Sequence, residues 1–76
     1  MKSTAELEAA LIEVWTEVLG TPGIRPGTSL FDAGGTSLTA VRIRARINAL
    51  LDEDLVVGDV LENSTPEEMA EFIRAR

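Results

Sequence analysis

The hydrophobic positions of the chain follow a helical period in several segments. In the first segment, Thr4 to Leu19, apolar residues recur every three or four positions and form a single stripe: Leu7, Leu11, Val14, Trp15 and Val18. Such spacing places these side chains on one face of an amphipathic helix. Ser3 and Glu6 have the spacing of a capping box, and Gly20 is placed to end the helix. We therefore predict a first helix whose stripe, Trp15 included, is buried.

A second helix is predicted from Ser37 to Leu51, and it carries apolar residues on two sides. At about 100° per residue, one side holds the residues that we assign to the core: Ala40, Ile43, Ile47, Leu50 and Leu51. The other side holds Leu38, Val41 and Ala45. A surface helix ordinarily has a single apolar stripe. The second stripe is therefore either covered by a neighbouring part of the chain or exposed for a partner, and the sequence leaves both open.

Two shorter segments complete the predicted fold. Val56 to Leu61 predicts a short helical turn, weakened by Gly58. Thr65 is expected to cap a last helix in a capping box with Glu68, and Pro66 suits the first helical position. The buried face of this helix is expected to hold Met69, Phe72 and Ile73. Since no segment alternates like a strand, the predicted fold class is all-α: a small four-helix bundle with three main helices and one short helix.

The connection between the first two helices, Thr21 to Thr36, is long and rich in glycine and proline. Loops of this length inside a compact domain are uncommon and are often functional. We expect three apolar residues, Ile24, Leu30 and Phe31, to pin this loop to the core. Phe31 in particular is predicted to be buried.

Size and charge limit the functions open to the chain. Its 76 residues form one small domain, near the size at which a hydrophobic core suffices without disulfides or metals. It contains no cysteine and no histidine, so no metal site is predicted. A net charge of −6 argues against nucleic acid as a partner. The sequence shows neither a transmembrane stretch nor a signal peptide, and we expect a cytoplasmic protein that does not bind membranes.

One segment, Phe31-Asp32-Ala33-Gly34-Gly35-Thr36-Ser37-Leu38, places a serine after a glycine pair and at the start of the second helix. A nucleophilic serine needs a base, usually histidine, which the chain lacks, so we predict that the protein is not an enzyme. A phosphate-binding P-loop needs a preceding strand and a lysine, and both are missing here.

Two interpretations of Ser37 remain from the residues alone. Ser37 either caps the second helix or, if Thr36 shares that task, is free to be modified. The negative charge of a phosphodiester would suit a helix N-terminus. Gly34 and Gly35 lack side chains and would let a modifying enzyme come close to the hydroxyl.

The F-x-x-G-G-x-S-L pattern and the order of helices resemble the peptidyl carrier proteins, or thiolation domains, of nonribosomal peptide synthesis, within the phosphopantetheine-binding acyl carrier family. The resemblance covers essentially the whole chain and implies a single carrier domain, residues 1–76. It implies that Ser37 bears a covalent 4′-phosphopantetheine arm, with Gly34, Gly35 and Thr36 as the surrounding cofactor-binding residues. The thiol of the arm would carry an aminoacyl, peptidyl or acyl group as a thioester in antibiotic or hybrid natural-product biosynthesis.

The resemblance also implies partners for a monomeric carrier. A magnesium-dependent phosphopantetheinyl transferase would add the arm from coenzyme A, and adenylation, condensation, thioesterase or tailoring enzymes would meet the loaded carrier. Leu38 and Val41 match positions at which family members contact partner enzymes, and we include Arg42, Arg46 and Val57 in this predicted partner surface. Fatty acid carriers often have an acidic second helix, so partners adapted to them are expected to bind poorly. An unmodified helical interaction domain that uses the Leu38 and Val41 stripe is the alternative.

Overall fold

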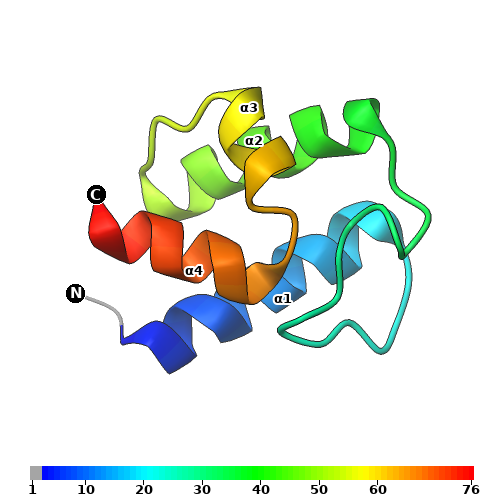
Figure 1. Cartoon of the computed structure of the whole chain (residues 1–76), viewed down its shortest axis with the longest axis horizontal. Helices are drawn as coiled ribbons and strands as arrows, with labels where there is room; N and C mark the ends of the chain where they lie inside the picture. Colours follow the sequence, from blue (N-terminus) through cyan, green and yellow to red (C-terminus); the bar gives the residue numbers. More distant parts are fainter. Residues whose placement is uncertain (1–2) are drawn as a thin grey trace.

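The computed structural model describes residues 3–76, and these residues form four α-helices (Figure 1). The helices are α1 (Thr4–Leu19), α2 (Ser37–Leu51), α3 (Val57–Glu62) and α4 (Pro66–Ala75). Helix α1 packs against both α2 and α4, while the short α3 packs against α2. The predicted all-α bundle, with one short helix and a long connection after α1, is confirmed. No helix within residues 3–76 is long and apolar enough to cross a membrane.

The core lies among the four helices and includes residues of two connections, Leu30 and Leu55. Its fully buried side chains include Leu11, Val14, Trp15, Leu30, Ile43, Ile47, Val60 and Met69. Trp15 has an exposed fraction of 0%, as predicted, and its indole N–H donates to the backbone carbonyl of Ser64 at 3.1 Å. The indole therefore joins α1 to the segment that leads into α4.

The ends of α1 and α4 show how far the predicted caps are realised. The Ser3 hydroxyl accepts from the Glu6 N–H at 3.1 Å, and the Glu6 carboxylate accepts from the Ser3 N–H at 3.0 Å. Gly20 ends α1 in the left-handed conformation, with φ at 66°. At α4 the Thr65 hydroxyl accepts from the Glu68 N–H at 3.1 Å but donates to the Glu68 carboxylate. The predicted reciprocal box at Thr65 is therefore wrong in its second half.

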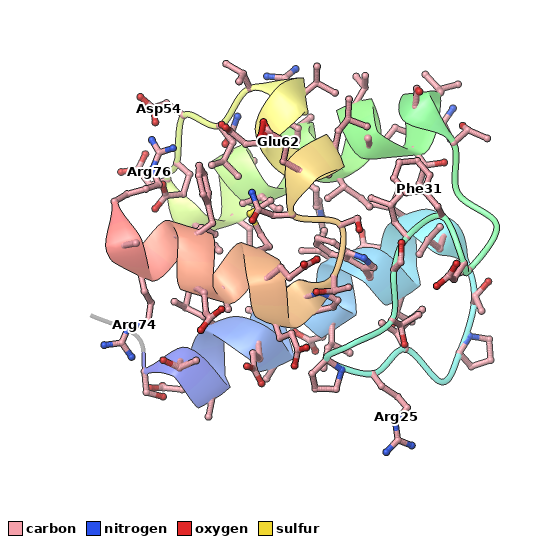
Figure 2. All side chains as sticks on the ribbon, in the orientation of Figure 1. Arg25, Phe31, Asp54, Glu62, Arg74 and Arg76 are labelled. Carbon is pink, nitrogen blue, oxygen red and sulfur yellow. The ribbon has the colours of Figure 1, made fainter. Side chains whose placement is uncertain are left out.

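Two predicted core residues lie at the surface. Phe31 is 44% exposed (Figure 2), and Leu30 holds the loop to the core instead. Leu30 is fully buried, and its N–H donates to the Ser64 carbonyl at 2.9 Å. Leu50 is 53% exposed although it lies only about 20° from the buried Ile43 around the helix axis. It is two turns further along α2, where surface hollows flank it on both sides.

Candidate functional site

The start of α2 presents Ser37 to solvent. Thr36 is the N-cap, with an extended backbone, and its hydroxyl accepts from the Thr39 N–H at 3.5 Å. In return the Thr39 hydroxyl accepts from the Thr36 N–H at 3.0 Å. Ser37 is the first helical residue, its side chain is exposed, and its hydroxyl has no hydrogen-bond partner in the described part of the chain. Because Thr36 supplies the cap, the Ser37 hydroxyl is free to react.

Glycine suits the two positions before this cap for different structural reasons. Gly34 has φ at 90°, in the left-handed region that favours glycine, and the space beside its Cα is open. A Cβ on Gly35 would lie 2.6 Å from the Leu30 carbonyl oxygen and 3.1 Å from a methyl carbon of Leu19. The Gly35 N–H also donates to that carbonyl at 2.8 Å. Gly35 therefore packs the loop against the core, a reason that the sequence analysis did not give. That the two glycines let a modifying enzyme approach the hydroxyl stays a prediction.

The charge pattern at the start of α2 favours an added anion. The first turn of α2 contains no acidic residue, whereas those of α1, α3 and α4 do: Glu6, Asp59, Glu67 and Glu68. Unpaired N–H groups and the helix dipole stabilise a negative charge at such an end by about 0.3–1 kcal/mol. A phosphodiester on Ser37 thus fits the residues present. Among the described residues there is no group of three or more potential metal ligands.

The second apolar stripe of α2 is exposed rather than covered. Leu38 has an exposed fraction of 60% and Val41 one of 41%. Val57, predicted to share their surface, is instead partly buried against the core, while α3 and its N-cap expose Val56 and Leu61. The sequence held a signal for this: Val57 precedes the buried Val60 by three positions, so both lie on one face of α3.

The two arginines predicted to frame the partner surface differ in their contacts. The Arg46 guanidinium pairs with the Glu17 carboxylate of α1, with Nη2 and Oε1 2.9 Å apart. Arg42 is exposed and forms no ion pair with any residue from 3 to 76. The unbalanced positive charge beside Leu38 therefore comes mainly from Arg42.

Residues 9–73 match the family described as the phosphopantetheine attachment site. The chain belongs to this family. It is therefore a carrier domain and not an enzyme, and its cofactor is covalent 4′-phosphopantetheine, which the start of α2 can accommodate.

Relatives and solved structures agree with this assignment. Tyrocidine synthase 3 of Brevibacillus parabrevis is 35% identical over 68 residues, which make up 90% of this chain and 1% of that protein. BlmI, a type-II acyl carrier protein from Streptomyces verticillus involved in bleomycin biosynthesis, superposes with a TM-score of 0.88 at 29% identity, covering 95% of this chain and 87% of BlmI. The structure of the phosphopantetheine transferase Sfp with coenzyme A and a peptidyl carrier protein contains a chain that matches with a TM-score of 0.85 at 25% identity. The match covers 100% of this chain and 95% of that chain. The chain spans 1–4% of the length of its curated relatives.

Proposed function

We propose that Ser37 is the attachment residue. We also propose that the domain presents aminoacyl, peptidyl or acyl thioesters to the enzymes of nonribosomal peptide or hybrid natural-product biosynthesis. The observation that carries this proposal is the free, exposed hydroxyl of Ser37 at the start of α2, inside the region that matches the family. The sequence relatives support the pathway class, since they include plipastatin and tyrocidine synthases and a polyketide synthase.

The attachment step needs little from the chain beyond position. The Ser37 oxygen attacks the phosphorus of coenzyme A that bears pantetheine. A new Oγ–P bond forms, the P–O bond to adenosine 3′,5′-bisphosphate breaks, and the hydroxyl proton passes to a base of the transferase. The chain contains no histidine that could take this proton itself. Its own contribution is the Thr36–Thr39 cap, which keeps the hydroxyl unbonded, and the first-turn N–H groups, which favour the new negative charge. Once attached, the arm supplies a thiol that forms the thioester.

The partner surface that we propose lies next to the attachment residue. It consists of the exposed Leu38 and Val41 with Arg42 at their side, and it extends to the exposed Leu61 of α3. A transferase with coenzyme A and then adenylation, condensation, thioesterase or tailoring enzymes are its proposed partners. An apolar centre with a charged edge is the usual composition of a protein-binding patch. The monomeric state, the cytoplasmic location and the extent of the domain over residues 1–76 stay predictions.

Intact-protein mass spectrometry tests the proposal. After incubation with coenzyme A and a broad-specificity transferase, the parent should gain one phosphopantetheine, and Ser37→Ala should gain none. Ser29 and Ser64 are natural internal controls, because their hydroxyls already bond to each other at 3.3 Å. An arm on Ser37→Ala would refute the assignment to Ser37. A parent without an arm would refute the carrier function and favour an unmodified interaction domain.

A further inference from the structure

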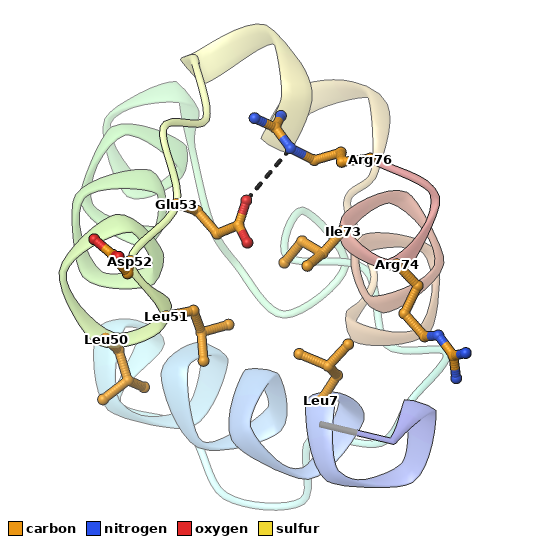
Figure 3. Close-up of a pocket in the computed structure, with 8 residues that line it drawn as sticks. All are labelled: Leu7, Leu50, Leu51, Asp52, Glu53, Ile73, Arg74 and Arg76. Atoms are coloured by element: carbon orange, nitrogen blue, oxygen red, sulfur yellow. Dashed lines mark ion pairs between the residues drawn. The ribbon is translucent and has the colours of Figure 1, made fainter. Parts of the chain in front are cut away.

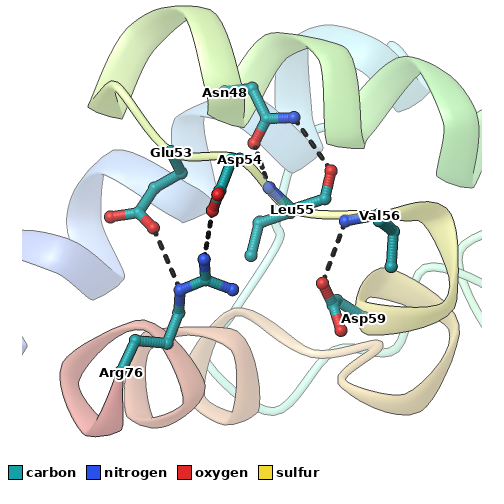
Figure 4. Close-up of polar contacts among 7 residues, drawn as sticks. All are labelled: Asn48, Glu53, Asp54, Leu55, Val56, Asp59 and Arg76. Atoms are coloured by element: carbon teal, nitrogen blue, oxygen red, sulfur yellow. Dashed lines mark hydrogen bonds and ion pairs between the residues drawn. The ribbon is translucent and has the colours of Figure 1, made fainter.

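The connection from α2 to α3, residues 52–56, is held by side chains from both helices (Figure 4). From α2, the Asn48 side chain donates to the Leu55 carbonyl at 3.0 Å and accepts from the Leu55 N–H at 2.9 Å. From α3, the Asp59 carboxylate accepts from the Val56 N–H at 2.9 Å. The backbone on both sides of the buried Leu55 is therefore fixed before α3 begins.

A third anchor comes from α4. Arg76, the C-cap of α4, reaches across to two successive acidic residues of the connection (Figure 4). Its Nε lies 3.3 Å from the Glu53 carboxylate, and its guanidinium also pairs with Asp54. The guanidinium lies over the Phe72 ring, 5.7 Å from its centroid. A planar guanidinium can serve two carboxylates and an aromatic ring at once, which a lysine ammonium cannot do equally well.

The same ion pair closes one side of a hollow of about 530 Å³ between the ends of α2 and α4 (Figure 3). Leu7, Leu51 and Ile73 line the hollow from three helices. The pair between Glu53 and Arg76 spans the gap. At Glu53 and Asp54 the α2–α3 connection is tied to α4 by charge, whereas Leu55 is held by burial in the core.

Helix α3 depends on such anchors. It has only six residues, Gly58 among them, and its N-cap Val56 provides no side-chain cap. A helix this short is unstable by itself in water. It nevertheless carries Leu61, and its cap Val56 is also exposed, so the position of α3 determines where these two apolar side chains lie relative to α2.

We propose that Arg76 is a positioning residue for α3 and thereby a determinant of partner choice. By holding Glu53 and Asp54, it fixes the connection from which α3 begins. Because the Arg76 and Glu53 side chains are partly exposed, their pair contributes little to global stability and acts mainly on local opening. The inference rests on the proposed carrier function, since only partner binding gives the position of α3 a consequence.

Amide hydrogen exchange tests the local effect in the parent, Arg76→Gln and Arg74→Gln. Arg74 is the matched control, because it comes from the same helix end but points away from the connection and bonds to Thr4 of α1 (Figure 2). In Arg76→Gln the amides of residues 58–62 should exchange about two- to five-fold faster, the scale of a lost exposed ion pair. In Arg74→Gln they should not change. Equal α3 exchange in the two variants, or a uniform rise over all four helices in Arg76→Gln, would overturn the proposal.

Partner dependence is the second measurement, since a merely structural role would slow every partner alike. Leu61→Ala first identifies which enzymes touch α3, among a broad-specificity transferase and an adenylation enzyme that loads the arm. Arg76→Gln should slow only the enzymes that Leu61→Ala slows, and Arg76→Lys should recover part of the rate. Slowing of enzymes that are indifferent to Leu61→Ala would contradict the inference. If the parent acquires an arm but the pattern is absent, only this inference fails, whereas a parent without an arm refutes the carrier function itself.

Discussion

Arg46 of α2 and Glu17 of α1 form an ion pair across the two helices, with their nearest atoms 2.9 Å apart. Both side chains are about half exposed, so the pair contributes roughly 0–1 kcal/mol to stability. Glu17 neutralises a charge that the sequence assigns to the partner surface, and Arg42 is left as the unbalanced cation beside Leu38.

The first prediction concerns this asymmetry between the two arginines. Basic groups next to the attachment serine should attract acidic partner surfaces and repel basic ones, mainly through the association rate. A broad-specificity transferase should therefore modify the parent faster than a transferase adapted to acidic carriers. Arg42→Gln should narrow this difference more than Arg46→Gln does, and added salt should narrow it too. Equal rates of the two transferases on the parent would show that the arginines are solvent-exposed residues without an effect on partner choice.

A second prediction separates the cap of α2 from its reactive residue. Thr36→Ala removes the hydroxyl that accepts from the Thr39 N–H and should lower the free energy of unfolding by about 0.5–2 kcal/mol. Ser37→Ala removes an exposed hydroxyl without a partner in the described chain, and its effect should stay within about 0.5 kcal/mol. Urea denaturation of both variants measures the difference. A loss at Ser37→Ala as large as that at Thr36→Ala would mean that Ser37 shares the cap.

Much of the fold could be predicted because the helices and their ends are indicated by local sequence patterns. The stripe around Trp15, the capping box of Ser3 with Glu6 and the helix end at Gly20 are local patterns. The box and the helix end are confirmed, and the stripe is buried except for Val18, which is partly buried. The long loop has no period, so the sequence could not tell which of two neighbours, Leu30 or Phe31, turns inward. The inward-facing Leu30 has its N–H bonded to the carbonyl of Ser64, 34 positions further along the chain, and such a distant contact cannot be read from the loop alone.

In the candidate site, too, local features could be predicted from the sequence and contacts between distant segments could not. Ser37 and Thr36 could be found because caps and motifs are local, and their geometry agrees with the sequence analysis. The pairing of Arg46 with Glu17 depends on how two helices cross, which no single segment encodes. The role of Arg76 depends likewise on the meeting of α4 with the α2–α3 connection.

The third prediction tests which residue anchors the loop. Leu30→Ala should lower the free energy of unfolding by about 2–5 kcal/mol, since Leu30 is fully buried. Phe31→Ala should cost clearly less than the roughly 3–5 kcal/mol of a buried aromatic, because Phe31 is 44% exposed. Thermal unfolding followed by circular dichroism compares the two. A lower melting temperature for Phe31→Ala than for Leu30→Ala would reverse the assignment of the anchor.

The last prediction uses the glycine pair to separate loop packing from backbone conformation. Gly35→Ala places a Cβ 2.6 Å from the Leu30 carbonyl oxygen, and backbone cannot yield as a flexible side chain can. The loop must shift, at a cost of about 1–3 kcal/mol on the scale of overpacked sites. Gly34→Ala meets open space, and its cost comes only from the positive φ, about 1–2 kcal/mol.

The shift at Gly35 should also move Thr36 and Ser37, so Gly35→Ala should slow modification by the transferase more than Gly34→Ala does. The modification rate and the free energy of unfolding are both measured for each variant, and the two rankings are compared. If Gly34→Ala is modified more slowly while remaining the more stable variant, the enzyme needs Gly34 for close approach, and packing at Gly35 is not what limits the reaction.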